Sequence, residues 1–161
     1  MRRCLAAMAS LPVLVMAHLG QAQSLQGDPI GDVLLGLPNE TSPRSATYQM
    51  KASLYHAGAR GVGTLDSLGC RVVAMRTAAI DAQVIPKHTV LFIKETVGLP
   101  MPDGSLHDGY WYASDTGGGI KGTRIDLFTG SSARSTAAFR QLNMAHLSVS
   151  AVGVFQGCPP N

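Results

Sequence analysis

The sequence predicts a mainly β protein whose strands close into a small barrel, with one or two short helices. Short segments rich in β-branched and aromatic residues recur between turns that contain glycine or proline. Apolar side chains follow a helical spacing only in residues 132–143. Closing such a sheet removes the exposed strand edges that promote aggregation, so a barrel is the favoured architecture.

The N-terminal residues have the pattern of a secretory signal peptide, which we place at residues 1–22. Two arginines follow the first methionine, an apolar stretch runs from residue 5 to residue 19, and Gly-Gln-Ala offers a cleavage site. The stretch is too short and too interrupted for a stable membrane span, so we expect export to the periplasm or the extracellular space. An uncleaved N-terminal anchor is the alternative. Residues 23–46 predict an extended segment before one domain over 47–161.

Six segments of this domain have the composition of strands, and turn signals lie between them. Gly58 to Gly63 is a turn-rich break, and Pro102-Asp103-Gly104 predicts an exposed loop. The expected strands cover residues 47–54, 70–75, 89–94, 110–114, 124–128 and 147–155. A helix of two or three turns is expected over 132–143.

The net charge and the spacing of the histidines argue against two kinds of function, nucleic-acid binding and metal binding. The chain has 13 basic and 10 acidic residues, and loss of the two N-terminal arginines lowers its net charge from +3 to about +1. That value argues against nucleic acid as a partner, because nucleic-acid binding needs a basic face. The four histidines that follow the predicted signal peptide show no metal-ligand spacing, so we predict no metal and interpret them as structural or surface residues; they are His56, His88, His107 and His146.

Signal cleavage would also remove Cys4 and leave Cys70 and Cys158. Two cysteines in an oxidising compartment predict one disulfide, which would tie an early strand to the C-terminal tail. Two buried free thiols are the alternative.

The segment from Asp115 to Phe128 is the most informative part of the chain. It places Asp115 and Asp126 on either side of three consecutive glycines, with two basic residues nearby. The glycines allow the backbone to take positive φ or to approach a ligand closely. Two acids beside such a turn are a common arrangement for acid–base chemistry on sugars or acyl groups. A tight turn with surface charges is the other interpretation.

Strand alternation sorts the side chains of this region into two faces. In residues 124–128, Ile125 and Leu127 suit the core. Arg124, Asp126 and Phe128 share the other face. In the preceding strand, Trp111 lies on the face opposite both flanking tyrosines. We expect Trp111 in the core, although stacking on a sugar ring is an alternative.

The same region resembles the signature of the 3D domain, a family named for three aspartates. The matching runs are Asp-Thr-Gly-Gly-Gly-Ile-Lys-Gly over 115–122 and Arg-Ile-Asp-Leu-Phe over 124–128. Upstream, Arg-Thr-Ala-Ala-Ile-Asp over 76–81 and Val-Ile-Pro over 84–86 resemble the segment of the first aspartate. The three aspartates would be Asp81, Asp115 and Asp126. The family includes a membrane-bound lytic murein transglycosylase and small stand-alone stationary-phase muralytic proteins, which are the nearer in size.

The resemblance implies a six-stranded double-psi β-barrel that cleaves peptidoglycan glycan strands without a cofactor. A lytic transglycosylase breaks the β-1,4 bond between N-acetylmuramic acid and N-acetylglucosamine, and the muramyl 6-hydroxyl attacks the anomeric carbon to form a 1,6-anhydro end. By this analogy Asp126 acts first as acid and then as base, which requires partial desolvation. Asp115 would orient the site or stabilise charge, and Asp81 would brace the turns. Substrate-binding or supporting residues would be Thr116, Gly117, Gly118, Lys121 and Arg124, although Lys121 suits a solvated turn equally well.

Other functions remain open at the level of the sequence. Asp115-Thr116-Gly117 also reads as an aspartic-protease triplet, but the glycines and the Arg-Ile-Asp strand that follow do not belong to that pattern. The glycine turn is not a phosphate loop, because no Lys-Ser or Lys-Thr follows it. A non-catalytic, expansin-like glycan-binding barrel and an exported murein-targeting effector are the alternatives to an enzyme of the cell wall.

Overall fold

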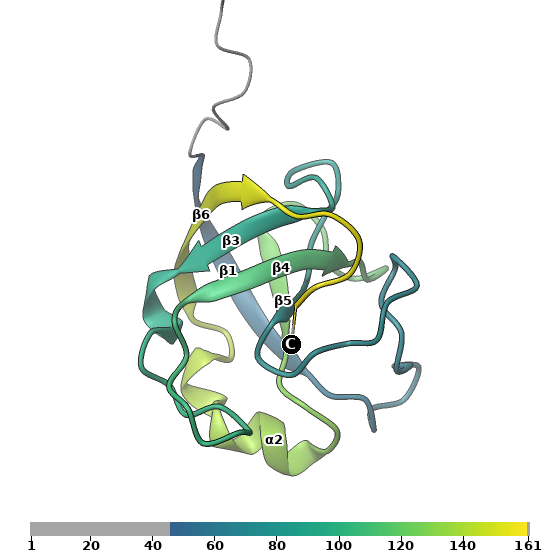
Figure 1. The fold of residues 1–161 in the computed structure, drawn as a ribbon, viewed down its shortest axis with the longest axis vertical. Coiled ribbons are helices and arrows are strands. Elements are labelled where there is room, and N and C mark those ends of the chain that lie inside the picture. Colours follow the sequence, from purple (N-terminus) through teal and green to yellow (C-terminus); the bar gives the residue numbers. More distant parts are fainter. Residues whose placement is uncertain (1–45, 161) are drawn as a thin grey trace, which may run out of the picture. The chain divides into compact units, whose positions relative to one another are not determined.

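The computed structural model of the protein describes residues 46–160. These residues form a closed barrel of six strands with one short α-helix and two 3-10 segments (Figure 1). The elements are β1 (Thr47–Tyr55), β2 (Thr77–Ala79), β3 (Thr89–Ile93), η1 (Lys94–Thr96), β4 (Tyr110–Asp115), β5 (Arg124–Phe128), α2 (Ala133–Ala138), η2 (Arg140–Leu142) and β6 (His146–Val154). The predicted mainly β barrel is confirmed.

The expected signal peptide and nearly all of the expected extended segment lie outside the described residues. Within residues 46–160, no helix has the length and apolarity needed to cross a membrane.

The barrel mixes parallel and antiparallel pairs in the order β1-β5-β2-β4-β3-β6. The short strand β2 pairs in parallel with β4 on one side and antiparallel with β5 on the other. In this register Ala79 lies opposite Asp115 on β4 and opposite Asp126 on β5. The topology therefore brings two acids that are 11 positions apart in sequence to either side of one alanine.

Apolar side chains from every strand fill the barrel. Ile125 and Leu127 are completely buried, as strand alternation predicts. Trp111 is also completely buried and donates its Nε1–H to Thr96 Oγ1 at 3.0 Å, so it belongs to the core. Phe128 was expected on the outer face but is only 4% exposed, because its ring packs against Tyr55 at a centroid distance of 5.2 Å.

Residues 70–75 do not form the strand that their composition predicts. They form an irregular segment, with only Arg71 bridged to Leu65, and the strand starts at Thr77 instead. Met75 takes a φ of 59°, in the left-handed region that a β-strand excludes, while its amide donates to the Phe128 carbonyl at 2.8 Å. Contacts with distant residues thus bend this segment before the chain enters the barrel.

The helix predicted over 132–143 is shorter than expected. The α-helical part α2 has six residues, none of them buried, and Phe139 ends it with a φ of −116° and a ψ of 20°. The Phe139 side chain turns into the core, and the 3-10 segment η2 follows with Leu142 buried. A helix that buries no face of its own gains little from packing, so the core contacts of Phe139 and Leu142 decide where it ends.

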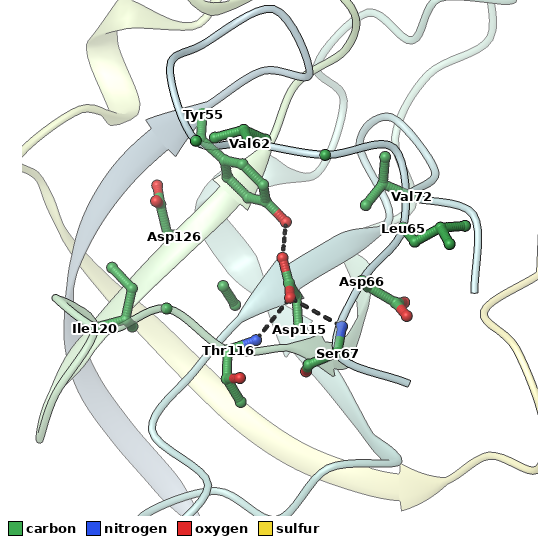
Figure 2. A pocket seen from close by; sticks show the side chains of 14 residues that line it. Tyr55, Val62, Leu65, Asp66, Ser67, Val72, Asp115, Thr116, Ile120 and Asp126 are labelled. Atoms are coloured by element: carbon green, nitrogen blue, oxygen red, sulfur yellow. Dashed lines mark hydrogen bonds between the residues drawn. The ribbon is translucent and has the colours of Figure 1, made fainter. Parts of the chain in front are cut away.

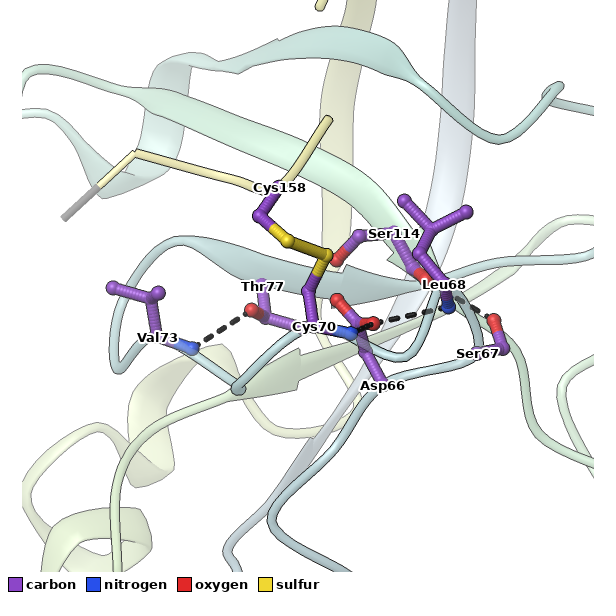
Figure 3. Close-up of a disulfide and its surroundings, with 8 residues drawn as sticks. All are labelled: Asp66, Ser67, Leu68, Cys70, Val73, Thr77, Ser114 and Cys158. Carbon is purple, nitrogen blue, oxygen red and sulfur yellow. Dashed lines mark hydrogen bonds between the residues drawn. A yellow bond between two sulfur atoms is a disulfide. The ribbon is translucent and has the colours of Figure 1, made fainter. Parts of the chain in front are cut away.

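The predicted disulfide is present between Cys70 and Cys158, with their Cα atoms 5.5 Å apart (Figure 3). It joins the irregular segment before β2 to the C-terminal tail, across a sequence separation of 88 residues. Closing a loop of this length stabilises the fold by about 4.6 kcal/mol in the chain-entropy treatment.

Candidate active site

A pocket of about 360 Å³ opens where the glycine turn and the 61–67 loop meet the barrel (Figure 2). Its charged lining residues are Asp66, Asp115 and Asp126, and we name it the acidic pocket. In Figure 2 Asp115 lies at the centre, with Asp126 on one side and Asp66 on the other. The pocket is lined by Tyr55, Gly61, Val62, Gly63, Leu65, Asp66, Ser67, Val72, Ala79, Asp115, Thr116, Gly117, Ile120 and Asp126.

The strand order explains why Asp115 and Asp126 share this pocket. Because β2 lies between β4 and β5, the two residues are separated by two strand spacings, about 10 Å between Cα atoms. Ala79 lies between them and contributes only a methyl group. The space between the two carboxyl groups therefore stays open to a bound molecule.

Three donors hold the carboxylate of Asp115 in a fixed orientation. The Tyr55 hydroxyl donates to Oδ2 at 2.8 Å, while the backbone amides of Ser67 and Thr116 donate to Oδ1 at 3.1 and 2.8 Å. These donors come from β1, from the 61–67 loop and from the glycine turn. A carboxylate held in this way presents its negative charge in one direction and has little freedom to rotate.

Asp126 has a different environment. Its Oδ1 atom is buried and has no hydrogen-bond partner among residues 46–160. Burial is the main cause that raises the pKa of Asp126 above its ordinary value, and the negative charge of Asp115 adds to it, while Ser53 and Arg124 oppose the change. The two acids of the pocket therefore differ: one is fixed by donors, and the other is poised to hold a proton.

Tyr55 is a site residue that the sequence did not reveal. Burial, followed by the charge of Asp115, raises its pKa far above the ordinary value, so the hydroxyl stays a donor to Asp115. Tyr55 ends β1, 60 positions before Asp115, and no local pattern distinguishes it from other strand aromatics.

Asp66 and Ser67 were also missed. Asp66 is 7% exposed, and its Oδ1 accepts the amides of Leu68 and Cys70 at 3.0 and 2.9 Å. Its Oδ2 is buried without a partner in the described part of the chain. The hydroxyl of Ser67 donates to the Ser114 carbonyl at 3.0 Å, next to the amide contact with Asp115. A turn-like composition was the only sequence signal here.

Asp81 does not line the acidic pocket. Its Oδ2 accepts the Gly122 amide at 2.9 Å and its Oδ1 accepts the Gln83 amide at 3.1 Å. The bond from Gly122, followed by the bond from Gln83, holds the pKa of Asp81 below its ordinary value. The carboxylate thereby joins the segment after β2 to the end of the glycine turn.

The supporting residues expected on the turn divide into two groups. Thr116 and Gly117 line the pocket, whereas Gly118, Lys121 and Arg124 lie outside its lining and are exposed. At Gly117 a Cβ atom would lie 2.9 Å from Ile120 Cγ1, so the close approach of the turn to Ile120 requires glycine there.

Residues 76–142 match the family model of the 3D domain, which confirms the resemblance seen in the sequence. The matched region contains Asp81, Asp115 and Asp126 but not Tyr55 or the 61–67 loop. A comparison with curated proteins found no match.

Solved structures of lytic transglycosylases share low sequence identity with the chain. Escherichia coli MltA with bound chitohexaose is 21% identical with a TM-score of 0.42, over 56% of this chain and 27% of that chain. MltA from Neisseria gonorrhoeae is 23% identical with a TM-score of 0.44, over 59% and 23%. A membrane-bound lytic murein transglycosylase from Agrobacterium tumefaciens is 26% identical with a TM-score of 0.40, over 55% and 25%. The chain thus spans about a quarter of the length of these proteins.

Proposed function

We propose that the protein is an exported lytic transglycosylase that cleaves the β-1,4 bond between N-acetylmuramic acid and N-acetylglucosamine in peptidoglycan. The observation that carries the proposal is the pairing of two unlike carboxyl groups in one open pocket. Asp126 has a buried, unpartnered oxygen and a raised pKa, while Asp115 is fixed by three donors. The match of residues 76–142 to the 3D domain supports the choice of peptidoglycan as substrate.

In the first step, protonated Asp126 donates its proton to the glycosidic oxygen. The bond between the muramyl anomeric carbon and that oxygen breaks, and N-acetylglucosamine leaves with a free 4-hydroxyl. Positive charge develops on the muramyl ring, and the oriented carboxylate of Asp115 stabilises it.

In the second step, Asp126 is a carboxylate and acts as the base. It takes the proton of the muramyl 6-hydroxyl, whose oxygen forms a bond to the anomeric carbon and closes the 1,6-anhydro ring. Asp126 thereby regains its proton, so the cycle needs no water and no cofactor. One carboxyl serves both steps because its environment favours the protonated form at the start of each cycle, and the second step restores that form.

The test is digestion of murein sacculi, with mass analysis of the soluble products. We expect the wild type to release 1,6-anhydro muropeptides and Asp126→Asn to release at least about a hundredfold fewer, which is the usual contribution of a general acid–base group. The matched control is Asp103→Asn, because Asp103 lies in the exposed 100–109 loop outside the acidic pocket and asparagine can keep its turn contacts with Ser105.

Each other outcome has a distinct meaning. Products with reducing ends would identify a hydrolase, and retention on sacculi without release would identify a glycan-binding barrel of the expansin-like kind. A folded Asp126→Asn variant that digests sacculi at the wild-type rate would show that another group is the acid.

A further inference from the structure

A second pocket lies beside the acidic pocket, and we name it the basic pocket. It has a volume of about 430 Å³ and lies between the end of β1 and the segment that contains α2 and η2. Tyr55 lines both pockets, so the two pockets adjoin at this residue. The lining residues of the basic pocket are Leu54, Tyr55, His56, Ala59, Ala133, Thr136, Ala137, Arg140 and Asn143.

The two pockets carry opposite charge. Arg140 and His56 line the basic pocket and no carboxylate does, whereas the charged residues of the acidic pocket are three aspartates. Arg140 is exposed, and its guanidinium forms no ion pair or hydrogen bond with any side chain of residues 46–160. The Gly58 amide donates a hydrogen bond to Nδ1 of His56 at 3.1 Å, so the neutral ring carries its hydrogen on Nε2. The basic pocket therefore presents N–H donors of Arg140 and His56 that no side chain of residues 46–160 accepts.

The chemistry of the proposed substrate places an anion near these donors. Under the proposed function, the muramyl residue itself occupies the acidic pocket, because its own 6-hydroxyl attacks its anomeric carbon. The same sugar carries a lactyl group, which either is a free carboxylate or bears a peptide stem with carboxylates of its own. The fixed carboxylate of Asp115 repels such a group from the acidic pocket, so it must lie to one side of the reacting bond.

We propose that the basic pocket binds the carboxylate-bearing substituent of the muramyl residue, with the Arg140 guanidinium as its partner. This inference rests on the proposed function. Arginine presents paired N–H donors that match a carboxylate, and the small side chains of Ala133 and Ala137 leave room for the substituent. The protein then recognises muramyl glycans by charge and distinguishes them from uncharged chitin-like glycans.

The experiment measures glycan affinity by titration calorimetry in the Asp126→Asn background, where bound glycan is not cleaved. Three ligands are compared: muramyl glycans with peptide stems, the same glycans after enzymatic removal of the stems, and chito-oligosaccharides of equal length. We expect at least one carboxylate-bearing ligand to bind about fivefold more tightly than the uncharged one, which corresponds to an exposed ion pair. Preference for stem-bearing glycan assigns the stem carboxylates, and preference for the stripped glycan assigns the lactyl carboxylate.

Arg140→Gln should abolish this preference and leave the affinity for chito-oligosaccharides unchanged, which also shows that the variant is folded. Arg134→Gln is the matched control, since Arg134 lies on α2, is exposed and lines neither pocket. The inference is overturned if the preference is absent, or if Arg140→Gln weakens all three ligands equally. In both cases the proposed function survives as long as glycan binds, whereas no binding of any glycan would overturn both.

Discussion

The hydroxyl of Tyr55 shows how one atom can set the chemistry of the site. It supplies the only side-chain donor that Asp115 has within residues 46–160, and the other two donors are backbone amides. Tyr55→Phe removes this donor but keeps the ring that packs on Phe128. We expect the release of anhydro products to fall about tenfold, because loss of one charge-assisted hydrogen bond to Asp115 raises the barrier by about 1.4 kcal/mol.

Glycan affinity in the same variant should change little, since the ring and its packing on Phe128 remain. Tyr48→Phe is the control on the same strand, because no hydrogen bond engages the Tyr48 hydroxyl in the described residues. An equal fall in affinity and turnover for Tyr55→Phe would mean that the hydroxyl binds substrate and does not orient Asp115.

At the scale of elements, the 61–72 segment connects the disulfide to the acidic pocket. The Asp66 amide donates to the Cys70 carbonyl, and the Cys70 amide donates to the Asp66 carboxylate (Figure 3). The next residue, Ser67, donates its amide to Asp115 (Figure 2). Reduction of the disulfide frees the Cys70 end of this segment. We expect the free energy of unfolding to fall by about 2–5 kcal/mol and the turnover to fall with it, because Asp115 loses a fixed donor.

The measurement is urea unfolding and product release, each with and without reductant. The double variant Cys70→Ser, Cys158→Ser is the control, since it should match the reduced wild type and show no response to reductant. If the reduced protein stays folded and keeps full turnover, other contacts hold Ser67 against Asp115.

The same scale explains what the sequence could and could not predict. The longer strands were predicted because alternation and composition act locally, and β5 was placed at its observed bounds. The three-residue strand β2 was missed, because it exists through pairing with β4 and β5 on both edges. Asp115 and Asp126 lie beside one recognisable turn, whereas Tyr55, Asp66 and Ser67 reach the pocket from distant segments.

At the scale of the whole molecule, Asp126 links stability to activity. Its pKa is raised from an ordinary 3.8, mainly by burial, so the folded state holds the proton to higher pH than the unfolded chain does. Between the ordinary and the raised pKa, the unfolded state therefore binds fewer protons than the folded state. The full stability is present below the ordinary pKa, and part of it is lost as the pH rises through the raised pKa. Asp126→Asn removes this titration, so the variant should unfold less readily than the wild type near neutral pH.

Urea unfolding from about pH 4 to about pH 8 tests this difference, which we expect to stay below about 1 kcal/mol because the side chain is partly exposed. Asp103→Asn should change stability in the opposite direction, since hydrogen bonds from Ser105 lower the pKa of Asp103. Wild-type turnover should decline over the same pH interval in which Asp126→Asn becomes more stable than the wild type, because loss of the Asp126 proton lowers both turnover and stability. A wild-type stability curve parallel to that of the variant throughout would mean that Asp126 is already ionised, and it could not then be the acid that protonates the leaving oxygen.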